Sequence, residues 1–170
     1  MCIRDRDTIY TGAKFTRLYF KDCYIDGTTD FIFGPSTALF EDCIIHSKRN
    51  SYVTAASTPK EAKYGYVFKH CKLTAEPGVD KVYLGRPWRP YAYTLFIECE
   101  LGKHIVLAGW HNWGKQSNEE TARYMEYKNT GEGANASERV AWSKQLTKKE
   151  AEAVTVDAIF RTQSDWDPID

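Results

Sequence analysis

Four copies of one short phrase constrain this chain more than any other feature of its sequence. The template is Phe-x-x-Cys-x-apolar, found as FKDCYI (20–25), FEDCII (40–45), FKHCKL (68–73) and FIECEL (96–101). Successive cysteines lie 20, 28 and 28 residues apart. Each phrase alternates between apolar and polar residues, as a half-buried strand does. Strand-like phrases that recur every ~20–30 residues, without a long helical pattern, predict a solenoid.

The solenoid that fits these phrases is a right-handed parallel β-helix. Each coil places a strand about 4.8 Å from the strand before it, so equivalent residues stack in columns. We expect free cysteines that pack as small hydrophobic residues. The alternatives are a disulfide framework or a zinc site, but the spacing fits neither C-x-x-C ligand pairs nor a small cross-linked domain. The expected columns are Cys23, Cys43, Cys71 and Cys99, and Phe20, Phe40, Phe68 and Phe96.

The remainder of the chain predicts a single domain with an irregular tail. The repeat fades after Cys99, and residues 108–115 and 129–137 have the composition of loops. A capping box at residues 147–150 predicts a short helix that extends to about Val154. We interpret residues 1–6 as a non-native sequencing scar. Residues 7–170 are then expected to be the C-terminal portion of one β-helix domain that is N-terminally truncated.

Composition and charge exclude several classes of function. The 23 Lys and Arg residues balance 23 Asp and Glu residues, so the net charge does not indicate binding to nucleic acid or an anionic membrane. No apolar segment approaches the ~20 residues of a membrane-spanning helix. The sequence has no Ser-His-Asp arrangement and no cluster of metal ligands, and we expect neither a metal nor an organic cofactor.

The stretch GTTDFIFG (27–34) places an acid where a core strand should be apolar. Asp30 and Arg86 each lie 13 residues before the cysteine of the next phrase. Equal offsets predict that both lie on one wall of the solenoid, two coils and roughly 10 Å apart. An arginine can span that distance across the small residues 55–57 of the intervening coil. Asp7 is expected one coil below Asp30, so two carboxylates and one guanidinium should converge.

Such a convergence would suit covalent hydrolysis of an ester or a glycoside. A carboxylate beside a guanidinium is held in its charged form, which suits a nucleophile. A second carboxylate nearby is pushed toward its protonated form, which suits a general acid. Structural roles remain open: a buried ion pair for Asp30, a cap or turn for Asp7, and core packing for Trp88, Trp110 and Trp113.

Several segments resemble the signature segments of pectin methylesterases, also called pectinesterases. They are DTIY (7–10), GTTDFIFG, YVTAAS (52–57), LGRPWRPY (84–91) and GWHNW (109–113). The similarity continues in order to the C-terminus, and its wording is closest to the bacterial branch. The resemblance implies a right-handed parallel β-helix that removes methyl groups from the C6 esters of polygalacturonate and releases methanol.

The resemblance also implies a role for each matching residue. Asp30 would be the nucleophile, Asp7 the general acid and base, and Arg86 the residue that orients Asp30. The residues expected to line the sugar cleft are Tyr10, Phe33, Trp88 and Trp110. The implied partner is methyl-esterified homogalacturonan, and neither nucleic acid nor membrane is expected as one. The full-length protein is expected to be a monomer that is secreted or periplasmic.

Two departures from the family pattern predict that this chain alone is impaired. The family has a glutamine before the DTIY aspartate, and that position is Arg6 here. A second glutamine that holds the oxyanion belongs to an upstream segment, and an oxyanion donor is typically worth ~10²–10³ in rate. The alternatives are a polygalacturonase, a pectate lyase, or a non-catalytic relative that binds polysaccharide. The clustered aspartates of the first and the calcium site of the second are not apparent.

Overall fold

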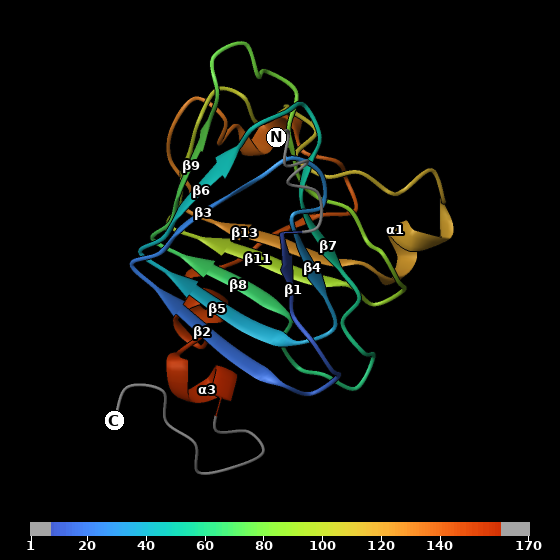
Figure 1. Ribbon diagram of the computed structural model, residues 1–170. Coiled ribbons are helices and arrows are strands. Elements are labelled where there is room, and N and C mark those ends of the chain that lie inside the picture. Colours follow the sequence, from blue (N-terminus) through green and yellow to red (C-terminus); the bar gives the residue numbers. More distant parts are fainter. Residues whose placement is uncertain (1–7, 161–170) are drawn as a thin grey trace.

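A computed structural model describes residues 8–160, which wind into a right-handed parallel β-helix (Figure 1). The first sheet has the order β1 (Ile9–Tyr10), β4 (Ile32–Gly34), β7 (Tyr52–Ala56), β10 (Tyr83–Gly85). The second has the order β14 (Lys144–Gln145), β13 (Arg123–Tyr127), β11 (Tyr93–Ile97), β8 (Tyr66–Lys69), β5 (Thr37–Glu41), β2 (Arg17–Lys21). The third has the order β12 (Glu100–Leu101), β9 (Lys72–Ala75), β6 (Ile44–Ser47), β3 (Tyr24–Gly27). All strand pairs are parallel, and the predicted fold is confirmed.

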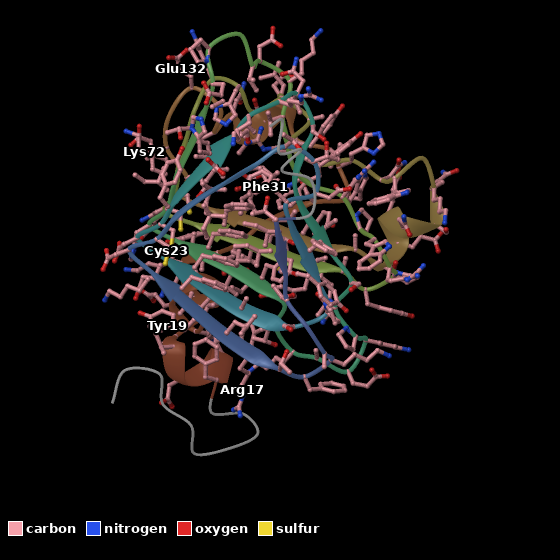
Figure 2. The ribbon with its side chains drawn as sticks, in the orientation of Figure 1. Arg17, Tyr19, Cys23, Phe31, Lys72 and Glu132 are labelled. Carbon is pink, nitrogen blue, oxygen red and sulfur yellow. The ribbon has the colours of Figure 1, made fainter. Side chains whose placement is uncertain are left out.

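The two predicted columns run through the core. The phenylalanine rings of successive coils are stacked, with centroids 4.8, 4.5 and 4.4 Å apart. The cysteines are free thiols, and all except the partly exposed Cys23 are buried. Figure 2 shows Cys23 at the corner between the second and third sheets. Each buried thiol donates to the phenylalanine carbonyl of the preceding coil, for example Cys71 Sγ to Phe40 at 3.3 Å. These contacts confirm that the thiols are structural.

The corner beside the cysteine column is a one-residue turn. The residue before each cysteine has a left-handed backbone, with φ between 50° and 54° for Asp22, Asp42, His70 and Glu98. A single left-handed residue bends an extended chain sharply, and Asp tolerates this conformation better than most residues. The turn therefore ends each strand of the second sheet and begins the next strand of the third.

A fifth coil follows where the sequence repeat is no longer visible. Strand β13 pairs with β11, and Glu126 takes the position that Phe96 holds in the coil before. Glu126 is buried and forms an ion pair with Arg139, with Nε 2.7 Å from Oε1. Asn129 follows the left-handed Lys128, and its Oδ1 accepts from the backbone N–H of Cys99. The Phe-x-x-Cys phrase therefore ends at Cys99 as expected, but the β-helix continues for one further coil.

The tail carries short helices against the outside of the second sheet. Helix α2 (Lys148–Glu152) begins with the predicted capping box between Thr147 and Glu150, and α3 (Val156–Phe160) follows. The apolar side chains of α3 pack on outward residues of β5, β8 and β11. Helix α1 (Ser117–Thr121) and the 3₁₀ helix η1 (Ala136–Glu138) lie in the preceding loops. Within residues 8–160, no helix is long and apolar enough to cross a membrane.

Candidate active site

Asp30, just before β4, and Arg86, just after β10, form a two-pronged ion pair on the first sheet. Arg86 Nε donates to Oδ1 of Asp30 at 3.0 Å, and Nη2 donates to Oδ2 at 2.7 Å. Asp30 has a left-handed backbone, with φ of 49°, just before β4. Asp30 is 7% exposed, so its carboxylate is largely shielded but still reachable by solvent. The contact predicted from the sequence is therefore present, in the geometry that makes arginine–carboxylate pairs strong.

Asp30 and Arg86 do not occupy the equivalent positions in their coils that their equal offsets from the cysteines had predicted. Ile32, Thr54 and Gly85 occupy one column of the first sheet. Asp30 lies two residues before this column and Arg86 one residue after it, so the two residues are offset by three positions. Only two residues separate β4 from β5, whereas seven separate β10 from β11. Counting back from the cysteines therefore aligned residues that are out of register, and the length of the arginine side chain closes the gap.

Two aromatic rings hold the Arg86 guanidinium. Its Cζ lies 3.9 Å from the ring centroid of Tyr52 and 3.7 Å from that of Trp113. The intervening coil thus supplies an aromatic ring where small residues were expected to leave a gap. These contacts add cation–π attraction and fix the plane of the guanidinium. Sequence reasoning assigned no role to Tyr52, although it begins the YVTAAS segment.

His111 lies behind this aromatic layer. Its ring is 5.4 Å from that of Tyr52 and 5.2 Å from that of Tyr83. Its Nδ1 accepts from the backbone N–H of Trp113 at 3.0 Å, which places the proton of the neutral ring on Nε2. Burial lowers the pKa of His111, and the nearby Arg86 charge lowers it further. A neutral histidine here adds no positive charge to compete with Arg86 for Asp30.

Three of the four predicted cleft aromatics form a row beside the ion pair. The Phe33 ring lies 5.0 Å from that of Tyr10 and 5.8 Å from that of Trp88. Tyr10 and Phe33 are paired in the first sheet. Tyr10 is 59% exposed and Trp88 is 37% exposed, so both ends of the row are accessible to solvent. Such rings suit stacking against the apolar faces of sugars.

The fourth predicted aromatic, Trp110, does not line an open surface. It is 1% exposed and stacks on Tyr124 with centroids 4.4 Å apart. A bridge pairs it with Gly85, and its ring turns inward to continue the core beside Phe96. The GWHNW segment has no apolar–polar alternation, so the sequence could not tell which of its tryptophans faces inward. Asp7 lies outside the described residues, and its convergence on this site stays a prediction.

Comparison with known proteins identifies the family. The family model described as Pectinesterase matches residues 3–163. The chain belongs to the pectinesterase family. It is 43% identical over 147 residues to pectinesterase 31 of Arabidopsis thaliana, covering 86% of this chain and 46% of that protein.

Solved pectinesterase structures have the same fold. Pectin methylesterase from carrot superposes with a TM-score of 0.82 at 32% identity, over 92% of this chain and 55% of that one. Pectin methylesterase from Yersinia enterocolitica superposes with a TM-score of 0.76 at 30% identity, over 95% of this chain and 57% of that one. This chain therefore spans about half the length of the relatives it matches.

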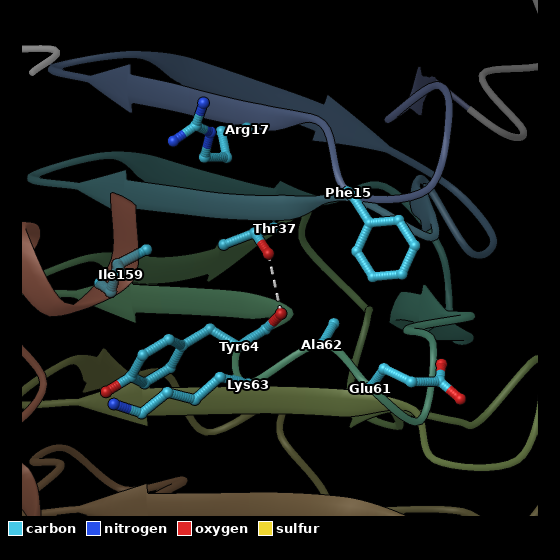
Figure 3. A pocket seen from close by; sticks show the side chains of 8 residues that line it. All are labelled: Phe15, Arg17, Thr37, Glu61, Ala62, Lys63, Tyr64 and Ile159. Atoms are coloured by element: carbon cyan, nitrogen blue, oxygen red, sulfur yellow. Dashed lines mark hydrogen bonds between the residues drawn. The ribbon is translucent and has the colours of Figure 1, made fainter. Parts of the chain in front are cut away.

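Elsewhere, the described residues of the chain offer no comparable site. Residues 8–160 contain no group of three or more His, Cys, Asp or Glu side chains placed to hold a metal ion. A pocket over the second sheet, beside α3, is lined by Arg17, Glu61 and Lys63 among others (Figure 3). The Thr37 hydroxyl there donates to the Tyr64 carbonyl. The lining mixes both signs of charge and includes no carboxylate paired as Asp30 is.

Proposed function

We propose that the chain carries the nucleophile and its arginine for a carboxylic ester hydrolase that removes methyl groups from the C6 methyl esters of polygalacturonate. The observation that carries this proposal is the two-pronged Asp30–Arg86 pair beside an exposed aromatic row, in a chain of the pectinesterase family. A purely structural ion pair would need no row of exposed rings beside it.

In the proposed reaction, a carboxylate oxygen of Asp30 attacks the ester carbonyl carbon. The tetrahedral intermediate collapses, the bond to the methoxy oxygen breaks, and Asp7 supplies the proton with which methanol leaves. A covalent anhydride between Asp30 and the substrate remains. Asp7 then takes a proton from water, which attacks the anhydride, and the free sugar acid and the Asp30 carboxylate are restored. Before the attack, Nε and Nη2 of Arg86 hold the Asp30 carboxylate in place through two hydrogen bonds.

The proposal also covers substrate binding by the aromatic row and the location of the full-length protein. Tyr10, Phe33 and Trp88 would stack on the sugar rings of methyl-esterified homogalacturonan and position one ester at Asp30. The chemistry requires no metal. We also propose that the full-length protein acts as a monomer outside the cytoplasm, since pectin polymers stay outside cells.

Methanol release from esterified pectin tests this function. The assay uses the protein together with any coils that precede residue 7 in its gene, beside a matched Asp30→Asn variant. We expect methanol from the parent and a loss of at least about 10³-fold in the variant, because the amide is a poor nucleophile of almost the same shape. Chain cleavage would instead indicate a polygalacturonase or lyase, and binding without turnover a non-catalytic relative.

A further inference from the structure

Arg123, the first residue of β13, extends its guanidinium to loops of the two preceding coils. Its Nε and Nη2 both donate to the Tyr91 carbonyl, at 3.0 and 2.7 Å. Nη1 donates to the Ala62 carbonyl at 2.7 Å, and Nη2 also donates to the Pro59 carbonyl at 3.1 Å. Tyr91 lies between β10 and β11, and the other two carbonyls lie between β7 and β8. One side chain of the fifth coil therefore ties a loop of the fourth coil to a loop of the third.

The tie reaches Tyr91 at a point where the backbone is strained. Tyr91 has φ of 67°, and this left-handed conformation is unfavourable for a bulky residue. Such a conformation persists only where the surrounding contacts hold it. A planar guanidinium with two donors on the Tyr91 carbonyl supplies a hold of fixed direction. Arg123 therefore stabilises the turn through which the loop after β10 returns to β11.

This loop carries two residues of the candidate active site. Arg86 and Trp88 lie five and three residues before Tyr91. The backbone N–H groups of Arg86 and Trp88 donate to carbonyls of β7 in the coil below, at 3.0 and 2.9 Å. Arg86 is also held by its bonds to Asp30, whereas the chain beyond Trp88 returns through the turn at Tyr91. Loss of the tie should therefore displace Trp88 more than Arg86.

We propose that Arg123 is a positioning residue that holds the Trp88 ring in place in the aromatic row. It acts through the backbone of the loop and does not itself touch substrate, because its four donated hydrogen bonds all go to backbone carbonyls. This inference rests on the proposed function, in which the row stacks on sugar rings. It implies that Arg123 contributes to the binding of pectin more than to the chemical step at Asp30.

Steady-state methanol release by the full-length protein tests the inference. Arg123→Met removes every donor, Arg123→Lys keeps the charge, and the exposed Arg49→Met is the control. We expect Arg123→Met to raise KM for pectin about tenfold with kcat within about twofold of the parent. Arg123→Lys should lie between the two, and the control should match the parent. A purely structural role would lower the active fraction, and with it the apparent kcat, at an unchanged KM.

A double-mutant cycle shows whether the effect passes through Trp88. In a Trp88→Ala background, Arg123→Met should change KM by less than about twofold, because the ring that Arg123 positions is absent. A change as large as in the parent background would overturn the inference, as would an unchanged KM for Arg123→Met. Where Arg123→Met does not fold, Arg123→Lys carries the same comparison.

Hydrogen exchange followed by mass spectrometry tests the tie without requiring turnover. We expect the amides of residues 88–92 to exchange at least about tenfold faster in Arg123→Met, while those of β5 stay within about twofold of the parent. Equal rates in residues 88–92 would overturn the inference. Absence of methanol release by the unmutated protein would instead mean that the proposed function fails, and the exchange rates would still decide whether Arg123 holds this loop.

Discussion

Arg86 does two things that a lysine at this position could not do. Its planar guanidinium donates two parallel hydrogen bonds to Asp30, and its faces lie between the rings of Tyr52 and Trp113. A lysine ammonium is a compact point charge on a flexible stem, so it would satisfy the charge without fixing the direction of the carboxylate. At the scale of the residue, replacing Arg86 with lysine therefore separates the effect of its geometry from the effect of its charge.

We predict that Arg86→Lys in the full-length protein lowers kcat by about 10²-fold, although the positive charge is kept. The reason is that a misaimed carboxylate loses the near-attack geometry on which covalent catalysis depends. The measurement is methanol release at saturating pectin, with the exposed Arg49→Lys as a matched control that should retain full activity. A variant within a few-fold of the parent would mean that charge alone suffices.

At the scale of the element, the strands that carry the repeated phrase could be predicted from the sequence, and those without it could not. The phenylalanine and cysteine columns could be predicted because each of these coils repeats an inward phenylalanine followed three residues later by an inward cysteine. Strand β13 could not, since Glu126 replaces the phenylalanine and pairs with Arg139, thirteen residues further along the chain. The orientation of Trp110 was likewise hidden, because neither alternation nor repeat applies to its loop. Pairing between distant polar residues leaves no local pattern to read.

The buried Glu126–Arg139 pair yields a prediction for the fifth coil. Glu126→Gln should lower the free energy of unfolding by about 3–5 kcal/mol, because it leaves the Arg139 guanidinium buried without a compensating charge. The double variant Glu126→Gln/Arg139→Gln should recover part of that loss. Urea denaturation followed by circular dichroism measures both, and the exposed Glu152→Gln provides a control near zero. Equal stability of the single variant and the parent would contradict this account.

At the scale of the whole molecule, the first described coil is the weak end of the stack. Strands β1, β2 and β3 are each terminal in their sheets as described. Core side chains there, such as Leu18, Phe20 and Cys23, are only partly buried, whereas Phe40 one coil above is fully buried. Sheet edges with half-covered apolar residues recruit further strands, whether from the same chain or from another copy.

We therefore predict that the 170-residue chain, expressed alone, self-associates and releases almost no methanol. A version that includes the upstream coils present in its longer relatives should be monomeric and active, because those coils would cover Phe20 and pair β2. Size-exclusion chromatography with light scattering measures the first effect, and methanol release from pectin the second. A Phe20→Lys variant of the short chain separates the causes: charge at the open edge should reduce self-association without restoring activity. Robust turnover by the monomeric short chain would show that the described coils suffice for catalysis.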